Sequence, residues 1–459
     1  FYLERRATAS DLRITEINYN AARANAVEAE AGASLAIPRL FTGGDFEFIE
    51  ICNVSASAVN LDGVKFTNGL PFTFPVTNLP AGGYVVVVED LEAFEVRYGT
   101  GLPVAGQFTG TLDNGGERIA FATWNGSGSQ DFTFDDGGTW PGRSDGIGSS
   151  LEIIDTAGDY GNSENWRSSC EYNGSPGALG AGLDGRIVVN EVLTNTDLPA
   201  IDRIELHNTT GASIPVANWY LSDANTNYRK FRISSGSIPA GGYLDWDESD
   251  FNANQNLALS SYSGTIAAAP TTVSDAAHGL STGDIITISG YGGIGAYNDT
   301  FEVTVPNANS FTIPVPFLDN HGTRGTYTSG GPFALSSQGD DVWLLEGDAS
   351  GKLLKFVDVV EFAAARSSET LGRWPDGAGS GTLVSMTANT LGSGNAAAQV
   401  GPVVISEVMY HPTATPENSY EYVEIRNSGS LPESLVNWRL RGGVDFDFTT
   451  AHSLSAGES

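Results

Sequence analysis

The sequence predicts an all-β protein built from tandem β-sandwiches. Three observations support this prediction: the apolar runs have the length of a single strand, turn-forming residues separate them at short intervals, and no long stretch has helical periodicity. The chain has 459 residues, 56 of them glycine, which suits many short strands joined by tight turns. This length allows about three domains of roughly 150 residues, each large enough to bury a core.

One pattern of strands occurs three times. Each copy opens with an apolar strand that carries one glutamate, and a second strand follows that reads Glu-x-x-Asn. The loops between the two strands differ in length while the strands persist, as expected of surface loops. Because an enzyme seldom repeats its active site in tandem, we expect these glutamates to belong to the scaffold. The opening glutamates are Glu16, Glu191 and Glu407, and the second strands begin at Glu50, Glu205 and Glu424.

Further elements follow in the same order. A strand containing Trp219 in the second copy and Trp438 in the third is expected to place both indoles in a core. Pro-Ala-Gly-Gly then stands before a strand at residues 80–83 and 239–242. The glycine pairs supply the positive φ that a tight turn requires.

These repeats divide the chain into a first sandwich (1–180), a second one split in two (181–256 and 332–398), and an incomplete third (399–459). Residues 257–331 interrupt the second copy and contain short strands of their own, so they are predicted to form a small inserted β-barrel that projects as a contact surface. The glycine-containing segments 180–182 and 392–394 predict flexible junctions.

The combined order resembles the bacterial lamin-tail domain. It comprises the strand glutamates, Glu-x-x-Asn, Asn-Trp-x-Leu, Pro-Ala-Gly-Gly-Tyr and the Gly-Ser-Pro-Gly of residues 174–177. The resemblance covers most of the chain and implies immunoglobulin-like sandwiches that serve as extracellular modules beside enzymes or adhesins. The second and third copies are similar to modules that precede a spore-coat CotH-like kinase in large secreted bacterial proteins. The insert is similar to a module of phage-tail and other bacterial surface proteins.

Charge narrows the choice of partners. The chain has 55 Asp and Glu against 23 Lys and Arg, a formal net charge of −32, which repels phosphate backbones and makes nucleic acid an unfavourable partner. No apolar run approaches the roughly 20 residues that span a bilayer, so membrane insertion of these modules is not expected. An excess of carboxylates suits divalent cations, solubility in high salt, or basic partners.

Two acidic loops are candidate calcium sites, because clustered hard oxygen ligands can complete a calcium shell. The first has alternating oxygen side chains at Asp223, Asn225 and Asn227, but it lacks the glycine and the distant glutamate of a calcium-binding loop. The second loop surrounds Trp140-Pro141, and its ligands would be Asp135, Asp136 and Asp145. The alternative for both loops is a solvated Asx turn.

The two cysteines, Cys52 and Cys170, both fall in the first copy. They could form a disulfide that closes a long loop, or remain as two buried free thiols. The sequence leaves both possibilities open.

Nothing in the sequence predicts catalysis. The five histidines are scattered without an i, i+4 pair or a nearby cysteine, and no kinase glycine loop or catalytic aspartate signature occurs. We therefore expect a non-catalytic, secreted or cell-surface bacterial scaffold that contacts other extracellular proteins or copies of itself. The alternatives are an accessory region of a secreted enzyme whose catalytic domain lies outside this chain, and a glycan-binding module, which requires solvent-facing tryptophans.

Overall fold

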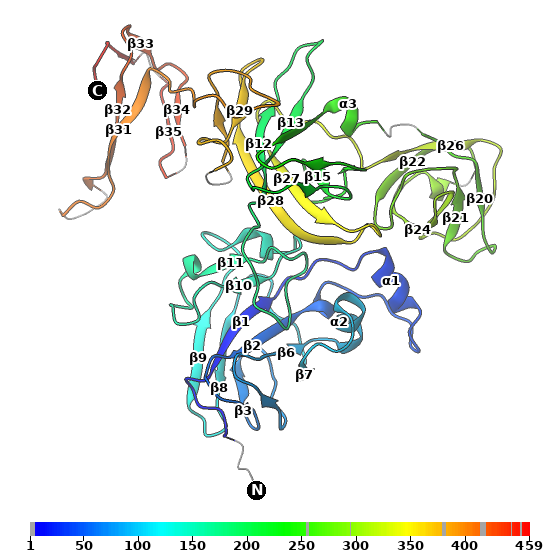
Figure 1. Cartoon of the computed structure of the whole chain (residues 1–459). Helices are drawn as coiled ribbons and strands as arrows, with labels where there is room; N and C mark the ends of the chain where they lie inside the picture. Colours follow the sequence, from blue (N-terminus) through cyan, green and yellow to red (C-terminus); the bar gives the residue numbers. More distant parts are fainter. Residues whose placement is uncertain are drawn as a thin grey trace.

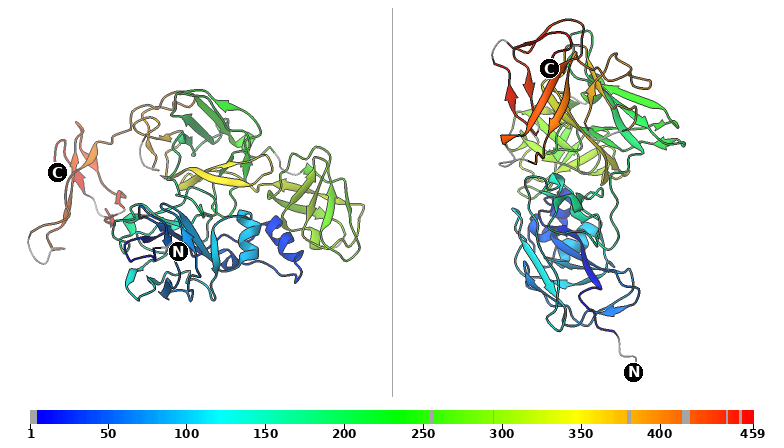
Figure 2. Two further views of the ribbon diagram at one scale, coloured as in Figure 1. Left: turned by 60° about the horizontal axis from the view of Figure 1, so that its bottom comes forward. Right: turned by 90° about the vertical axis from the view of Figure 1, so that its left-hand side faces the viewer.

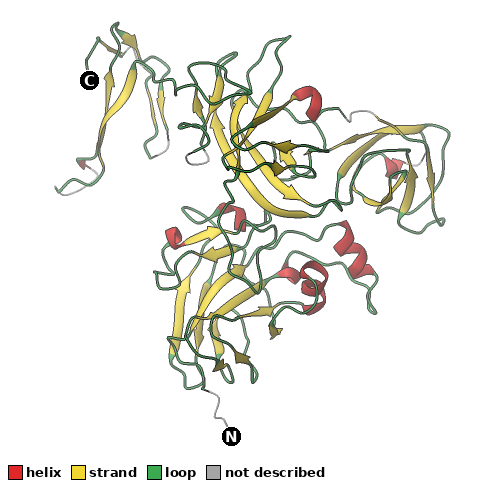
Figure 3. Cartoon of the chain, in the orientation of Figure 1, coloured by secondary structure: helices red, strands yellow, loops and turns green. Residues whose placement is uncertain are grey.

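The computed structural model describes residues 5–253, 257–293, 295–378, 382–413, 419–441, 443–449 and 452–459. Strands make up most of its regular structure (Figure 3), and they pair into separate groups of sheets along the chain. The predicted all-β class with immunoglobulin-like sandwiches is confirmed. No helix in the described ranges has the length and apolar character needed to cross a membrane.

The first sandwich packs a six-stranded sheet against a three-stranded one. Their order is β11-β10-β1-β2-β6-β7 and β4-β8-β9. The inner face of the larger sheet supplies Ile14, Ile17 and Ile51 to a core that Phe121 and Phe134 cover from the opposite side. The strands are β1 (Leu12–Asn18), β2 (Phe48–Asn53), β3 (Val59–Asn60), β4 (Lys65–Asn68), β5 (Asn78–Leu79), β6 (Tyr84–Val88), β7 (Val104–Gln107), β8 (Arg118–Ala122), β9 (Gly128–Thr133), β10 (Leu151–Ile153) and β11 (Trp166–Ser168), with helices α1 (Ala26–Ala33) and α2 (Leu91–Tyr98).

The second sandwich repeats this plan. Its sheets have the orders β18-β13-β12-β29-β30 and β16-β15-β27-β28. Trp219 is buried in the core between them, as predicted from its position in the repeat. The elements are β12 (Ile187–Leu193), β13 (Arg203–Asn208), β14 (Ile214–Pro215), β15 (Tyr220–Ser222), β16 (Phe231–Arg232), β17 (Ser237–Ile238), β18 (Tyr243–Asp247), α3 (Glu248–Phe251), β27 (Gly339–Gly347), β28 (Leu353–Ala363), β29 (Thr370–Gly372) and β30 (Val384–Ser385).

The insert lies between β18 and β27 of the second sandwich and folds around a core of its own, which includes Val273, Ile286 and Tyr327. Two four-stranded sheets enclose this core, with the orders β19-β26-β22-β23 and β20-β21-β25-β24. Figure 1 shows the insert and the third unit on opposite sides of the second sandwich, and the left view of Figure 2 agrees. The strands are β19 (Leu257–Ala258), β20 (Ser261–Ser263), β21 (Thr271–Ser274), β22 (Ile285–Tyr291), β23 (Thr300–Glu302), β24 (Thr304–Asn307), β25 (Ser310–Ile313) and β26 (Arg324–Ser329).

The third unit has three two-stranded ribbons, β31-β32, β33-β36 and β34-β35. Side chains that fill the core elsewhere are exposed here: Ile405 is 59% and Val408 53% exposed, whereas Ile14 and Ile17 are fully buried. The core position predicted for Trp438 is wrong, since Trp438 is 38% exposed. No second sheet covers it in the described part of this unit. The strands are β31 (Val403–Met409), β32 (Tyr422–Asn427), β33 (Glu433–Ser434), β34 (Arg439–Leu440), β35 (Phe446–Asp447) and β36 (Ser453–Leu454).

Candidate functional site

The opening strand of every copy has the same irregularity. Its pairing with the second strand shifts by one residue just before the glutamate, between Ile14 and Glu16 in the first copy, and the same shift recurs in the other two. After the shift, the opening glutamate lies directly opposite the glutamate of the second strand. Like charges at opposing positions destabilise a sheet, so each pair needs compensating donors. The pairs are Glu16 with Glu50, Glu191 with Glu205, and Glu407 with Glu424.

In the first sandwich the donors come from residues 174–177. The Ser175 backbone N–H donates to Glu16 Oε1 at 2.8 Å, and the Gly177 backbone N–H donates to Glu50 Oε2 at 2.6 Å. Glu50 Oε1 accepts from Thr15 Oγ1 at 2.5 Å. The buried pair thus holds the segment that ends the module.

The second sandwich has the same arrangement. The Thr390 backbone N–H donates to Glu191 at 3.0 Å and its hydroxyl at 2.7 Å, while the Gly392 N–H donates to Glu205. Asn190 Nδ2 donates to the other oxygen of Glu205 at 2.9 Å. Ser175 therefore corresponds to Thr390, and Gly177 to Gly392. We call residues 174–177 and 390–392 closing loops, and each glutamate pair with its closing loop a glutamate clasp.

Two glycines of the segments predicted to be junctions are held by carboxylates. Gly392 is bound by Glu205, so segment 392–394 begins in a closing loop rather than forming a free hinge. Gly180 packs against Glu152, where an added Cβ would lie 1.8 Å from the carboxylate, and its carbonyl accepts from Arg167 at 2.7 Å. Gly180 and Gly392 are thus held by specific contacts, and flexing of the two junctions stays a prediction.

Burial changes the protonation of the clasp carboxyls. Desolvation raises the pKa of Glu50 and of Glu205 to about 7, although their hydrogen bonds act in the opposite direction. Desolvation also raises the pKa of Glu16 well above its usual value, with further increases from Glu50 and Glu152. A neutral carboxyl is favoured because burial penalises the charged form.

A recurrent asparagine fixes the turn before the next strand. Asn53 donates to the carbonyls of Leu79 and Pro80 at 3.0 and 2.9 Å. Asn208 does the same in the second copy, and Asn427 donates to Leu454 in the third. These three residues are the Asn of Glu-x-x-Asn, so this motif ties the second strand to the carbonyls of the turn before the next strand.

Aromatic side chains join the first two sandwiches. Tyr172 of the first packs against Tyr228 and Phe356 of the second, with ring centroids 6.1 and 5.8 Å apart. Tyr228 also donates through its hydroxyl to the Ile147 carbonyl at 2.7 Å. We call these contacts, together with Trp343, the aromatic joint.

Backbone pairing reinforces the aromatic joint. The Tyr172 N–H donates to Leu354 at 2.9 Å, and the Phe356 N–H donates to Cys170 at 2.7 Å. Lys355 of the same strand forms an ion pair with Asp184 at 2.8 Å. Strand β28 of the second sandwich thus pairs with the last turn of the first, which fixes their relative orientation.

The insert is anchored to the second sandwich. Asn227 Nδ2 donates to the Gly330 carbonyl at 3.1 Å, and Arg232 donates to Ser281. Arg229 lies so close to Gly283 that an added Cβ would meet its guanidinium carbon at 2.9 Å. The insert therefore has polar and close contacts with its host besides the two chain connections.

The first predicted calcium loop is occupied by protein groups. Asp223 forms an ion pair with Lys230 and accepts from the Ala334 N–H at 3.1 Å. Asn227 uses its oxygen for the Arg229 N–H and its amide for Gly330, while Asn225 is exposed. Calcium binding at this loop stays a prediction.

The carboxylates of the second predicted loop lie near Tyr19. Burial raises the pKa of Tyr19 to about 12, and Asp145, Asp136 and Asp135 add to this increase. Asp135 accepts from the Gly137 N–H at 2.9 Å, as in an Asx turn, and Asp145 accepts from Asn20 at 2.7 Å. Within the described ranges these carboxylates do not form a compact group of three. Calcium binding at this loop also stays a prediction.

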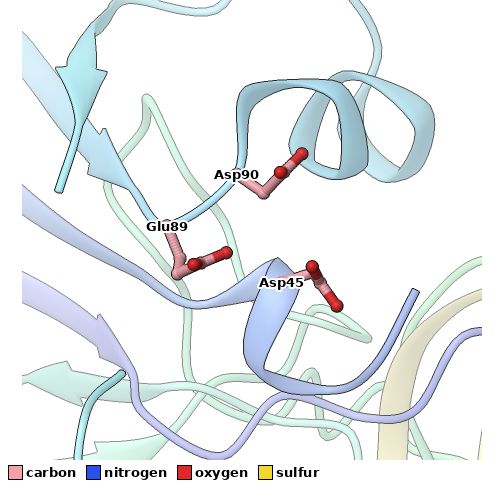
Figure 4. Close-up of side chains that lie close together, drawn as sticks. All are labelled: Asp45, Glu89 and Asp90. Carbon is pink, nitrogen blue, oxygen red and sulfur yellow. The ribbon is translucent and has the colours of Figure 1, made fainter. Parts of the chain in front are cut away.

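A compact acidic group lies elsewhere, at Asp45, Glu89 and Asp90 (Figure 4), whose ligand oxygens are within 4.8 Å of one another. No local pattern predicts this group, because Asp45 lies far in the chain from the adjacent Glu89 and Asp90. Arg39 forms ion pairs with Asp45 at 3.3 Å and with Asp90 at 2.5 Å. The single positive charge of Arg39 therefore offsets part of the negative charge of this group.

The cysteines are free and buried. Cys52 lies in β2, whereas Cys170 follows β11, and strands β1 and β10 lie between β2 and β11 in the sheet. Three strand spacings amount to about 14 Å, beyond the roughly 7 Å limit for the Cα atoms of a disulfide. Of the two possibilities that the sequence left open, the structure has two buried free thiols and not a disulfide.

Two surface features bear on ligand binding. Trp124 and Trp374 are each 50% exposed, and the Arg6 guanidinium lies 4.9 Å from the centre of the Trp124 ring. Separately, an open cavity of about 740 Å³ is lined by polar residues that include Asn20, Thr42 and Glu47. Burial raises the pKa of Glu47 to about 8, with its carboxyl accepting from the Leu112 N–H at 2.6 Å.

Comparison with known proteins identifies two regions of the chain. Residues 5–135 and 396–459 match the family model of the lamin tail domain, so the predicted resemblance is confirmed for the first sandwich and the third unit. The second sandwich lies outside the matched regions, but it has the same strand shift, glutamate clasp and asparagine contacts. No curated protein matches the chain. The similarities to modules beside a CotH-like kinase and to a phage-tail module stay predictions.

Proposed function

We propose that this chain is a non-catalytic structural or adhesive scaffold of a secreted or cell-surface bacterial protein. Lamin-tail-like sandwiches serve as its repeated β modules, and the insert is presented at a fixed position on the second sandwich. Its partners are other extracellular proteins or further copies of the chain. The net charge of −32 favours basic partner surfaces and disfavours nucleic acid.

The aromatic joint carries this proposal. A spacer that presents a contact surface must keep its modules in a set orientation, and here buried rings and backbone hydrogen bonds connect Tyr172 to Tyr228 and Leu354. Domains linked only by flexible glycines would not transmit an orientation. The repeated glutamates support the same proposal, because in the first two sandwiches each pair binds the loop that closes its own module.

Exposure on intact cells tests the proposal. Antibodies raised against the chain are expected to label unbroken cells of the source organism or to find the protein in the medium. Protease added outside should remove the cell-associated signal. Detection solely in the cytosol would contradict an extracellular scaffold.

A glycan-binding role is the second candidate, favoured by the exposed indoles of Trp124 and Trp374. Aromatic faces stack on sugar rings, and such contacts need exposed area. Retardation of the chain in gels that contain polysaccharide, lost in Trp124→Ala or Trp374→Ala, would support it. Unchanged migration in every polysaccharide tested would exclude it.

A further inference from the structure

The cavity of about 740 Å³ in the first sandwich lies between three loops. They are segments 20–23, 42–47 and 111–114, and we call the space between them the polar cavity. All of its lining residues belong to the first sandwich, so a single module supplies its walls. The lining includes neither the glutamates of a clasp nor the exposed indoles of Trp124 and Trp374.

Contacts between the three loops hold the walls of the polar cavity in place. An added Cβ at Gly43 would lie only 2.7 Å from the Ala21 carbonyl oxygen, so the first two loops touch closely. The Leu112 N–H donates to Glu47 at 2.6 Å and thereby connects the third loop to the second. A site with fixed walls loses less conformational freedom when a ligand binds.

Glu47 is the most buried polar side chain of the polar cavity, with 2% of its surface exposed. Its Oε2 atom accepts from the Leu112 N–H, whereas no donor to Oε1 is present among the described residues. Oε1 lies beside Gly44, where an added Cβ would be 3.5 Å away, and Gly44 also lines the cavity. The buried carboxyl therefore has one oxygen that a ligand in the cavity can contact.

The surroundings of Glu47 keep its carboxyl neutral. Burial raises its pKa to about 8, and the charges of Glu89, Glu117 and Asp45 add to this increase. At pH 7 the protonated form therefore predominates. Because Oε2 already accepts from Leu112, the proton resides on Oε1, where the hydroxyl can both donate and accept.

The rim of the polar cavity supplies further polar groups. Arg23 is exposed, and its guanidinium forms no ion pair or hydrogen bond with the residues that the structure describes. Thr42, Thr111 and Asn114 are also exposed and contribute hydroxyl and amide groups. The cavity thus combines donors and acceptors at its rim with a neutral carboxyl at its base.

This lining suits a neutral ligand better than an ion. A bound cation would need several ionised carboxylates, but only Glu47 and Asp113 among the lining residues carry a carboxyl group, and Glu47 is neutral. A bound anion would be repelled by Asp45, Glu89 and Glu117, the charges that raise the pKa of Glu47. The hydroxyl groups of a sugar both donate and accept, as this lining requires.

We infer that the polar cavity binds a neutral saccharide. The Glu47 hydroxyl donates to a sugar oxygen at the base, and Arg23 donates to sugar oxygens at the rim. The scaffold role does not require this site. The site shares only its ligand class with the glycan-binding candidate based on Trp124 and Trp374, and different variants test the two.

Saturation-transfer nuclear magnetic resonance tests the inference on the full chain. The probes are neutral oligosaccharides of glucose, galactose, mannose, xylose and N-acetylglucosamine, with tetragalacturonate as the anionic counterpart. At least one neutral probe should give a saturable signal with a dissociation constant of about 1 mM or lower. Arg23→Ala should weaken this binding about tenfold, whereas Lys65→Ala, at an exposed position outside the cavity, should leave it unchanged.

A second pair of variants occludes the cavity. Gly44 and Gly142 each begin a short helix, η1 (Gly44–Phe46) and η2 (Gly142–Ser144). Gly44→Val places a side chain beside Glu47 Oε1 and should abolish binding. Gly142→Val, where an added Cβ meets open space, should bind like the parent. Circular dichroism checks that both variants are folded.

Four outcomes would overturn the inference. They are no saturable signal with any neutral probe, tighter binding of tetragalacturonate than of every neutral probe, parent-like binding by a folded Gly44→Val chain, and binding that is lost in Trp124→Ala but kept in Gly44→Val. The last outcome would assign the sugar to the indole surface instead.

Discussion

Glu16 and Glu50 face each other directly across neighbouring strands, and both are buried. Their proximity would be unfavourable in isolation, because burial and like charge both penalise ionisation. Backbone N–H groups of Ser175 and Gly177 offset this penalty by binding one carboxyl each. A pair that destabilises the sheet locally thus fixes the segment that closes the module.

Stability should rise as the pH is lowered from about 7 to about 4.5. The pKa of Glu50 and of Glu205 is about 7 in the folded state, against 4.5 in the unfolded chain. The folded state therefore binds more protons than the unfolded state between these two pH values. Their stabilising protonated forms are lost as the pH rises through 7. Urea unfolding midpoints at several pH values measure the effect. A Glu50→Gln, Glu205→Gln chain should have a flatter profile, and an unchanged profile would contradict this assignment.

Asn208→Ala should lower the free energy of unfolding of the second sandwich by about 1 to 3 kcal/mol, because the buried carbonyl of Ile238 loses the Asn208 amide donor. Chemical denaturation measures the change. Asn225→Ala, at an exposed position, is the control and should change stability by less than about 0.5 kcal/mol. Equal effects of the two substitutions would refute the role given to Asn208.

Phe356→Ala should loosen the aromatic joint without unfolding either sandwich. The ring contacts Tyr172 and Tyr228. Its replacement by alanine leaves a cavity that destabilises this packing by about 3 to 5 kcal/mol. Small-angle scattering is expected to show a larger radius of gyration, while circular dichroism stays that of the parent. Trp124→Ala, an exposed aromatic of the first sandwich, serves as the control. A radius of gyration of Phe356→Ala equal to that of the parent would contradict the role given to the aromatic joint.

Both thiols should react with a thiol reagent only after denaturation. Cys52 and Cys170 are buried, and burial raises the pKa of the Cys170 thiol to about 12 and also raises that of Cys52. Titration of thiols in denaturant without reductant should then detect both cysteines as free thiols. Recovery of neither thiol under those conditions would point to a disulfide instead.

Calcium is tested by melting the chain with chelator and with added calcium. A cation bound specifically to the native loops at Asp223 or Asp135 would raise the melting temperature by mass action. Asp135→Asn and Asp223→Asn chains then identify the loop responsible. Identical midpoints in chelator and calcium would leave the Asx-turn interpretation in place for both loops.

Local signals in the sequence predicted the strands and turns well. Gly82 and Gly241 have φ of +67° and +62° in the two Pro-Ala-Gly-Gly turns, the conformation expected from their residue type. The scaffold role of the recurrent glutamates also followed from their repetition. Their partners did not, because Glu50 and Gly177 are 127 residues apart and nothing local connects them.

Contacts between modules could not be predicted from the sequence for the same reason. Tyr228 and Phe356 each occur in segments whose aromatic residues suggest an ordinary core, and nothing local indicates that they face another sandwich. The glycines of 180–182 suggested a hinge, but Gly180 is required by its close approach to Glu152. Glycine permits both a flexible link and a tight contact.

The most direct test of the rigid scaffold is a distance measurement between the first two sandwiches. Spin labels at exposed Val76→Cys and Leu198→Cys, with Cys52 and Cys170 replaced by serine, report the spread of relative orientations by electron paramagnetic resonance. A single narrow distance distribution, broadened by Phe356→Ala, is the result that the aromatic joint predicts. A broad distribution in the parent chain, unchanged by Phe356→Ala, would contradict it.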